Sequence, residues 1–393
     1  MSADPAARDV HSRSRLAGYD PETLFAARIL VVGCGALGQN VALCLALAGV
    51  GEIDVVDFDR FEPHNATRSP LYPTPAEARA LGLDKARVVA SKLKDRATAP
   101  HPRLRYALAP VQALGDLPVL RSDVVVCAVD TAEARAHLAE RCRLVGRVLV
   151  EAGFRGHELN MALYSEEPGD ACYRCSHPGR VGAFSCARYA LATEAEGVIP
   201  AIQNGAAALA AMQAETAIGW LHGSRALASS RVYFDLRTFE VQRAAMLRDP
   251  RCPGIHRGRP GPYRLLGTSS EDTLADLLRE VAADVPDPAI RPAALIVKRG
   301  ACVDCLALCE VMRPEWRWLM DPRCAACGGQ FAQASPGRMP AGASFLDESD
   351  EELADRPLAS LGFPPGSVVE VESGSELALY QLPGELEDLL VDA

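Results

Sequence analysis

The 393-residue sequence lacks the features that mark membrane, secreted and nucleic-acid-binding proteins. No apolar run reaches the roughly 18–20 residues that a membrane-spanning helix needs, and no segment repeats at a fixed period. The N-terminal residues 1–15 have no apolar core of the kind that a signal peptide carries. The net charge of −10 gives no electrostatic reason to bind nucleic acid. We therefore expect a cytoplasmic protein without a membrane or nucleic-acid partner.

The composition is that of a globular protein with many cysteines. Hydrophobic residues make up 49% and charged residues 23%, and the length suggests one large domain plus a smaller one. Four of the 13 cysteines sit in apolar or helical runs and are expected to be buried: Cys34, Cys44, Cys127 and Cys142. Most of the others form CxxC pairs, which in a reducing compartment favour zinc over disulfides.

Strand and helix patterns alternate through the first 154 residues. Strands are expected at 27–33, 52–59, 123–130 and 147–154, and helices at 36–49, 84–95 and 131–144. The continuous apolar run in 123–130 is typical of a strand buried on both faces. This alternation predicts an α/β fold with a Rossmann-like, doubly wound, mainly parallel sheet. A helix at 202–223 and an antiparallel strand at the sheet edge, 231–236, are expected to follow.

The chain is expected to divide at the turn-rich stretch 248–262. The predicted parts are an N-terminal arm, the main α/β domain, a connector, a cysteine-rich module and an acidic C-terminal module: 1–26, 27–257, 258–300, 301–333 and 344–393. The connector should contain a helix near 272–283, begun by a capping box at Thr268 and Glu271.

A glycine-rich loop follows the first strand, with Gly33, Gly35 and Gly38 opening a helix. Such a loop places backbone N–H groups and a helix N-terminus against a phosphate. Asp57, at the end of the second strand, is placed to bind a ribose. These features alone fit NAD, FAD or ATP equally.

Charged residues further along the chain favour ATP. Arg68 and Lys85 suit a polyphosphate, and Asp130 suits a Mg²⁺ ion, whereas a nicotinamide needs an apolar bed and little positive charge. The alternative is that Arg68 and Lys85 are ordinary solvated charges and that Asp130 is a helix N-cap. Because these charges do not suit a nicotinamide, an NAD-dependent oxidoreductase remains only a remote alternative.

The order of these motifs resembles the ThiF/MoeB/HesA family, bacterial relatives of ubiquitin-activating enzymes, over about residues 10–256. The segments that carry the resemblance are HSRSR (11–15), GCGALG (33–38), DFDRFEPHNATR (57–68), LDKA (83–86), AVD (128–130), DACYRC (170–175), the helix segment 196–221 and DPRCPGIH (249–256).

The resemblance implies an adenylyltransferase that uses ATP and Mg²⁺. Its substrate would be the C-terminal carboxylate of a small ubiquitin-like or sulfur-carrier protein ending in glycine, and the enzyme would be a homodimer. The implied nucleotide contacts are Gly33, Gly35, Gly38, Asp57, Asp59, Asn65, Arg68, Lys85, Asp130 and Thr131. Arg68, Lys85 and Asp130 would act in catalysis, and Arg13 would reach the phosphates of the other subunit.

Many relatives pass the acyl group to a cysteine in a crossover segment. Here the corresponding position holds Thr193, and the nearest thiol is Cys186, whose thiolate Arg180 and Arg188 would favour. The alternative is that Cys186 has no catalytic role. The acyl group of the adenylate would then pass directly to sulfide, an amine or a partner's thiol. A conjugating enzyme or a sulfur donor is then an expected further partner.

Two sets of residues have the spacing of zinc ligands. Cys172 and Cys175 are expected to bind zinc with Cys252 and His256; the family would have a cysteine where Ile255 stands, so Cys186 or water could replace the histidine. Two further CxxC pairs predict a closed, structural zinc ribbon: Cys302, Cys305, Cys324 and Cys327. A redox-active pair is the alternative there. Cys309 needs no role, and Trp316 and Trp318 either pack on the ribbon or form a docking face.

Other functions remain open within the same fold. The enzyme could adenylate a peptide or another carboxylate without a covalent intermediate; a tRNA-linked carboxylate is disfavoured by the acidic charge. A non-catalytic adaptor is a further alternative, against which the charged residues of the nucleotide site argue.

Overall fold

The computed structural model describes residues 10–167, 169–177, 201–252, 254, 256, 261–329, 342–374 and 376–393. It forms two compact units. The first comprises Met1–Val111, Pro118–Pro260 and Leu389–Ala393, and the second comprises Gln112–Leu117 and Gly261–Asp388. None of the helices in the described part of the chain has the length and hydropathy that crossing a membrane requires.

The first unit is built on a sheet that has nine strands among the described residues, in the order β16-β3-β2-β1-β4-β5-β6-β7-β8. Five neighbouring strands are parallel: β3 (Arg103–Ala107), β2 (Glu52–Val56), β1 (Arg28–Val32), β4 (Val124–Cys127) and β5 (Val148–Arg155). The flanking strands are antiparallel to their neighbours: β16 (Val391–Asp392), β6 (Glu158–Tyr164), β7 (Ser230–Asp235) and β8 (Val241–Ala245). The predicted doubly wound, mainly parallel sheet is confirmed.

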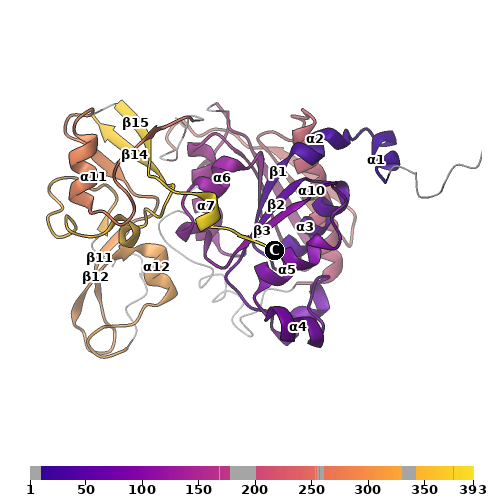
Figure 1. Ribbon diagram of the computed structural model, residues 1–393, viewed down its shortest axis with the longest axis horizontal. Helices are drawn as coiled ribbons and strands as arrows, with labels where there is room; N and C mark the ends of the chain where they lie inside the picture. The colour runs from indigo at the N-terminus through magenta and orange to yellow at the C-terminus, as the bar shows by residue number, and fades with distance from the viewer. Residues whose placement is uncertain are drawn as a thin grey trace, which may run out of the picture. The chain divides into compact units, whose positions relative to one another are not determined.

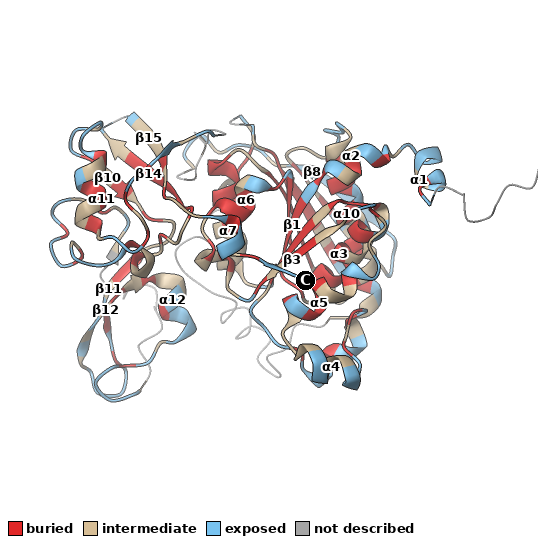
Figure 2. Cartoon of the chain, in the orientation of Figure 1, coloured by how far each residue is buried: buried red, intermediate tan, exposed pale blue. Residues whose placement is uncertain are grey.

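Helices cover both faces of this sheet (Figure 1). On one face lie α3 (Ala36–Ala48), α5 (Lys85–Lys94) and α10 (Gln203–Leu221); on the other lie α6 (Leu117–Arg121) and α7 (Ala132–Leu144). The shorter helices are α1 (Ser12–Leu16), α2 (Pro21–Ala26), η2 (Pro63–Arg68), α4 (Pro75–Leu81), η3 (Val111–Ala113) and α8 (Tyr173–Ser176). Figure 2 shows the buried residues on the central strands and on the helix faces that meet them, where one apolar core joins the sheet to α3, α5 and α10.

The strand order identifies the edge of the sheet at which a ligand is expected to bind. The chain runs outward from β1 to β2 and β3, and then returns to β4 on the other side of β1. Ligands of doubly wound sheets bind at such a reversal, beyond the carboxyl ends of the strands. The glycine loop after β1, Asp57 after β2 and Asp130 after β4 all follow strands that end at this edge.

Two local predictions are wrong. The strand at 231–236 is antiparallel as expected, but β8 pairs with its outer side, so β8 and β16 form the sheet edges. The helix α11 (Leu274–Val281) begins at a capping box of Thr273 and Asp276. Thr268 cannot serve there, because its N–H and hydroxyl both donate to Glu280.

The second unit contains two small sheets. One has the order β10 (Ala289–Arg291), β14 (Val368–Ser373), β15 (Glu376–Gln381) and β9 (Arg264–Leu265). The other has the order β12 (Leu308–Pro314), β11 (Ile296–Ala301) and β13 (Gly342–Ala343), and the unit also holds α11, α12 (Glu315–Met320), η4 (Leu358–Leu361) and η5 (Leu386–Asp388). Leu277 and Val371 belong to one core, so segments 258–300 and 344–393 pack together. The module boundaries expected from the sequence stay a prediction.

Candidate nucleotide site and metal centres

The loop after β1 requires glycine at two positions for steric reasons. Gly33 has a φ of +95°, and a Cβ there would lie 2.6 Å from the carbonyl oxygen of Ala128. A Cβ on Gly38 would lie 1.8 Å from the carbonyl oxygen of Gly33, because α3 packs directly on the loop. These glycines let the helix start immediately beside the strand end.

The start of α3 is open to a ligand. Gly35 is the N-cap, no side chain caps the helix, and a Cβ at Gly35 would meet nothing within 4 Å. The N–H groups of the first turn therefore lack the side-chain acceptor that many helices supply. A 13-residue helix that begins this way presents a positive dipole end to an anion such as a phosphate.

Asp57 links the end of β2 to the glycine loop. Its Oδ2 accepts a hydrogen bond from the Cys34 N–H at 2.6 Å, and its Oδ1 accepts one from the Asp59 N–H at 2.8 Å. Burial raises the pKa of Asp57 above its usual 3.8, although these two N–H groups and Lys85 oppose the shift. A carboxylate held in this way beside the loop is suited to accept a ribose hydroxyl.

Lys85, the first residue of α5, is fixed to Asp59 by two contacts. Its ammonium lies 2.8 Å from Asp59 Oδ2, and its backbone N–H donates to the Asp59 carbonyl oxygen at 2.9 Å. The Lys85 side chain is only 12% exposed, whereas that of Asp59 is 54% exposed. The cation is thereby held near the Asp57 carboxylate rather than extended into solvent.

Asn65 and Arg68 lie on η2. Asn65 is buried, and its Oδ1 accepts a hydrogen bond from the Glu62 N–H at 3.0 Å, so this oxygen caps the helix. Arg68 is half-buried and donates to the His64 carbonyl oxygen at 3.0 Å. The Asn65 amide thus orders the turn that carries the Arg68 guanidinium.

Asp130 follows β4 and is exposed. The alternative that it caps the next helix is wrong: Thr131 is the N-cap of α7, and its hydroxyl accepts from the Ala134 N–H at 3.3 Å. The Thr131 hydroxyl therefore caps α7, and Asp130 lies directly before this cap, at the same sheet edge as Gly33 and Asp57.

Two predicted catalytic residues are not brought to this edge by the described part of the chain. Cys186, with the rest of 178–200, lies outside the described residues. Arg13 is exposed on α1, and its action in a neighbouring subunit stays a prediction.

The first metal-ligand set converges in the first unit. The ligand atoms of Cys172, Cys175, Cys252 and His256 all lie within 4.8 Å of one another. Cys172 Sγ lies 3.7 Å from Cys175 Sγ and 3.6 Å from Cys252 Sγ, and Cys175 Sγ lies 3.4 Å from His256 Nε2. Such spacings fit the edges of a zinc tetrahedron. The N–H groups of Asp249 and Gly254 point at two of the sulfurs and would stabilise thiolates.

The second set lies in the second unit and comprises Cys302, Cys305, Cys324 and Cys327, again within 4.8 Å of one another. Cys309 also approaches this cluster, with its Sγ 3.5 Å from Cys324 Sγ. Trp318 is 2% exposed and belongs to the small core that contains Cys302 and Cys324. Of the two alternatives for Trp318, packing on the ribbon is therefore confirmed.

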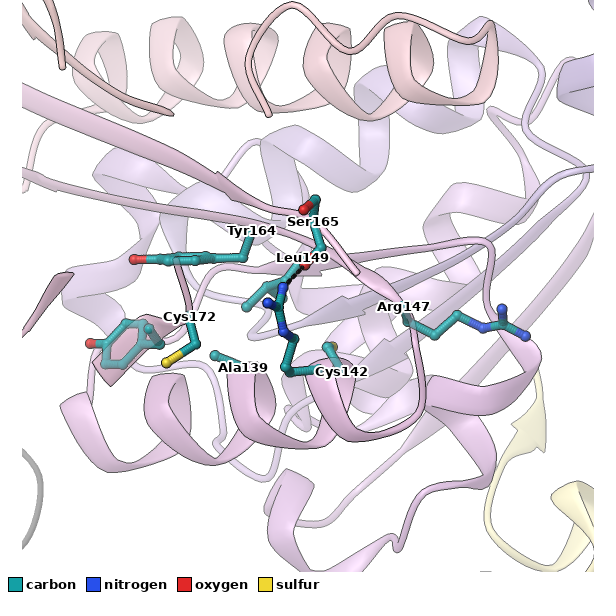
Figure 3. A pocket seen from close by; sticks show the side chains of 9 residues that line it. Ala139, Cys142, Arg147, Leu149, Tyr164, Ser165 and Cys172 are labelled. Atoms are coloured by element: carbon teal, nitrogen blue, oxygen red, sulfur yellow. Dashed lines mark hydrogen bonds between the residues drawn. The ribbon is translucent and has the colours of Figure 1, made fainter. Parts of the chain in front are cut away.

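A small pocket lies beside the first metal-ligand set and away from the nucleotide loop. Figure 3 shows Leu149, Tyr164 and Cys172 among the side chains around it. Leu149 is near the start of β5 and pairs with Tyr164 at the end of β6, whereas the glycine loop follows the end of β1. The pocket therefore belongs to the opposite end of the parallel strands and is not the candidate nucleotide site.

One residue of the candidate site was not predicted from the sequence. Gln39, in the first turn of α3, is completely buried and bonds both to the glycine loop and to the segment after Arg68. Its signal in the sequence is a long polar side chain directly after the last glycine, in a helix whose only other polar side chain is Asn40.

The described residues form a doubly wound α/β fold with a glycine loop at the point where the strand order reverses, and two clusters of four Cys or His side chains could each hold a metal ion. A model of the ThiF family matches residues 11–254, which is more than half of the chain. The protein therefore belongs to the ThiF family.

Several characterised proteins are similar to part of this chain. Adenylyltransferase and sulfurtransferase MOCS3 of Bos taurus is 33% identical over 232 residues, or 58% of this chain and 48% of that protein. The chain thus matches about half the length of this relative. The sulfur carrier protein adenylyltransferase of Thermus thermophilus is 32% identical over 243 residues, or 59% of this chain and 83% of that protein.

Solved structures show the same fold. The crystal structure of E. coli MccB with ATP aligns with a TM-score of 0.52 at 18% identity, covering 64% of this chain and 75% of that chain.

Proposed function

We propose that this protein activates the C-terminal carboxylate of a small ubiquitin-like or sulfur-carrier protein by ATP-dependent adenylation. The observation that carries the proposal is the uncapped start of α3 beside a half-buried carboxylate, Asp57, and a fixed cation, Lys85. The names of the relatives support it: they are adenylyltransferases, and one acts on a sulfur carrier protein.

Each side chain of the site has a role that its position suits. The N–H groups after Gly33 and Gly35 would bind phosphates, and Asp57 the ribose, with Asp59 holding Lys85. Lys85, Arg68 and the free amide hydrogens of Asn65 would bind the phosphate chain. An Arg13 from the second subunit of a homodimer would complete the set.

Asp130 is the residue that would hold Mg²⁺. Its carboxylate is exposed at the sheet edge and does not cap α7, so it fits an ion that takes one or two protein carboxylates and completes its shell with phosphate and water. When bound, the ion would neutralise charge on the leaving pyrophosphate.

The reaction needs positioning and charge rather than a general base. A carboxylate oxygen of the substrate attacks the α-phosphorus, the bond to the β-phosphate oxygen breaks, and pyrophosphate leaves with the electron pair. The attacking carboxylate is ionised at neutral pH, so no proton has to be removed. The contribution of Arg68 and Lys85 is then to stabilise the charge that develops on the phosphate oxygens.

The acyl group would next pass to Cys186 or directly to an external nucleophile. A cysteine acceptor predicts a conjugate that thiols release. Cys186→Ala should leave ATP–pyrophosphate exchange intact and abolish that conjugate; an unchanged conjugate would remove Cys186 from the mechanism.

The two cysteine clusters would each hold a structural zinc ion. Both ligand sets place four N or S donors within 4.8 Å, which suits tetrahedral zinc, and neither leaves a position for substrate. Thiolate ligands persist in a reducing compartment, which supports a cytoplasmic location. In this arrangement residues 27–257 form the adenylation domain, and a conjugating enzyme or a sulfur donor would be a further partner of the protein.

ATP–pyrophosphate exchange tests the proposal. Exchange should depend on a small carrier protein ending in glycine and should disappear in Asp130→Ala. Full exchange by Asp130→Ala would contradict the assignment of Asp130. Exchange that requires a short peptide and ignores the carrier would instead favour peptide adenylation.

A further inference from the structure

Gln39 makes three hydrogen bonds from a completely buried position in α3. Its Nε2 donates to the carbonyl oxygen of Cys34 at 2.9 Å and to the hydroxyl of Ser69 at 3.2 Å. Its Oε1 accepts from the N–H of Leu71 at 3.2 Å. All of these atoms belong to parts of the candidate site, because Cys34 lies between the loop glycines and Ser69 follows Arg68.

Few side chains of the segment that Gln39 holds are buried, although η2 also contacts α10 and the buried Phe61 and Leu71 flank the segment. Of residues 62–70, only Asn65 and Ser69 are buried, and Glu62, Pro63, His64, Ala66, Thr67 and Pro70 are exposed. The Oδ1 of Asn65 is used within the turn, on the Glu62 N–H. A six-residue 3-10 helix with an exposed surface does not fix its own position on the domain, since such helices have poor hydrogen-bond geometry and little buried surface.

We propose that Gln39 is a positioning residue: it fixes the turn that carries Arg68 against the glycine loop, so that the guanidinium and the loop N–H groups meet the same phosphate chain. One rigid amide bonded to both partners sets their separation. This inference rests on the proposed function, because it assumes that ATP binds at the glycine loop.

An apolar replacement would separate this role from simple packing. Gln39→Met keeps the length and most of the volume, but it leaves the Cys34 carbonyl, the Ser69 hydroxyl and the Leu71 N–H without their buried partner. We expect the dissociation constant of ATP, measured by titration calorimetry on the full chain, to rise about tenfold, as expected for the loss of one or two such bonds.

Asn40 provides a matched control on the same helix turn. It is also buried, and it forms a reciprocal amide pair with Gln203 at 3.0 and 3.4 Å without a hydrogen bond to Ser69 or Leu71 in the described part of the chain. Asn40→Ala removes comparable buried hydrogen bonds, so it should lower the free energy of unfolding in a similar way. It should change the ATP dissociation constant by less than about twofold, because the loop and the Arg68 turn stay joined.

A double-mutant cycle with Arg68→Ala decides between positioning and general destabilisation. If Gln39 acts through Arg68, Gln39→Met should have no further effect on ATP affinity once Arg68 is alanine. A full additional tenfold loss in that background would overturn the inference while leaving ATP binding intact. A wild-type protein that does not bind ATP would overturn both the inference and the proposed function.

Discussion

The ammonium of Lys85 lies 2.8 Å from a carboxylate oxygen of Asp59, and the backbone N–H of Lys85 donates to the carbonyl of the same residue. Asp59 therefore fixes both the start of α5 and the direction of the Lys85 side chain. In the proposed site this ion pair keeps a cation in place for the phosphates.

Lys85→Met should lower kcat for ATP–pyrophosphate exchange at least about 100-fold, because a fixed cation facing developing charge is worth several kcal/mol. The free energy of unfolding should change by less than about 1 kcal/mol, since ion pairs with an exposed partner contribute little. Lys92→Met is the matched control, as Lys92 lies on the same helix and pairs with Glu77. Equal losses of exchange in the two variants would contradict a specific role for Lys85.

Asp57 should make ATP binding sensitive to acid. The ionised carboxylate has acceptors for two N–H groups and a ribose hydroxyl, and protonation removes one of them. Because burial raises its pKa above 3.8, ATP affinity should begin to fall at a higher pH than an ordinary aspartate would cause. Titration of ATP binding at decreasing pH measures this, and Asp57→Asn should remove that part of the pH dependence.

The raised pKa of Asp57 also determines how this residue affects the free energy of unfolding at different pH values. The folded chain takes up this proton at a higher pH than the unfolded chain, so the ionised form of Asp57 opposes folding at neutral pH. This unfavourable contribution should disappear as the pH falls through the raised pKa. A wild-type minus Asp57→Asn difference in unfolding free energy that has no pH dependence above 3.8 would contradict the burial of this carboxylate.

Metal content should distinguish the two centres. We expect two zinc ions per chain by elemental analysis, and one in His256→Ala, because His256 Nε2 lies 3.4 Å from Cys175 Sγ. Cys44→Ser, on α3 and outside both ligand sets, should retain two. Two zinc ions in His256→Ala would show that another group is the fourth ligand of the first site.

Trp318 should report on the second centre. Its side chain is 2% exposed and packs with Cys302 and Cys324. Cys324→Ser should therefore shift Trp318 fluorescence to longer wavelength, as water reaches the ring. The same substitution in a Trp318→Phe background isolates the signal from the other two tryptophans; a shift that persists there would assign it elsewhere.

The sequence predicted the central strands well because they are continuous apolar runs between clear turn signals. It missed β3, where Arg103 and Arg105 conceal the strand pattern. The buried Arg105 pairs with Asp54 at 2.7 Å and with Glu52 at 3.2 Å, both on the neighbouring strand, and such pairings arise only in the folded chain. It also missed β8, since all five of its residues are exposed and no apolar alternation marks it.

The sequence supplied the residues proposed for the candidate site, but it did not predict the hydrogen bonds and ion pairs among them. Gly33, Asp57, Lys85 and Asp130 follow from motif order, because each stands at a strand end or helix start. The capping role of Thr131 and the ion pair of Asp59 with Lys85 could not be predicted, since both depend on side-chain geometry. Gln39 was missed for the same reason: two of its three partners, Ser69 and Leu71, are 30 and 32 residues away in sequence and adjacent only in the fold.

The central claim is that this protein joins AMP to a carrier's C-terminal carboxylate. The most direct measurement uses ATP radiolabelled at the α-phosphate and the Cys186→Ala variant, in which the adenylate cannot pass its acyl group to that thiol and so keeps the label. The substrates are a small carrier protein ending in glycine and the same carrier with its C-terminus amidated. The account predicts label on the free-acid carrier, none on the amidated carrier and none with Asp130→Ala. Labelling of both carriers, or of neither while ATP is bound, would contradict it.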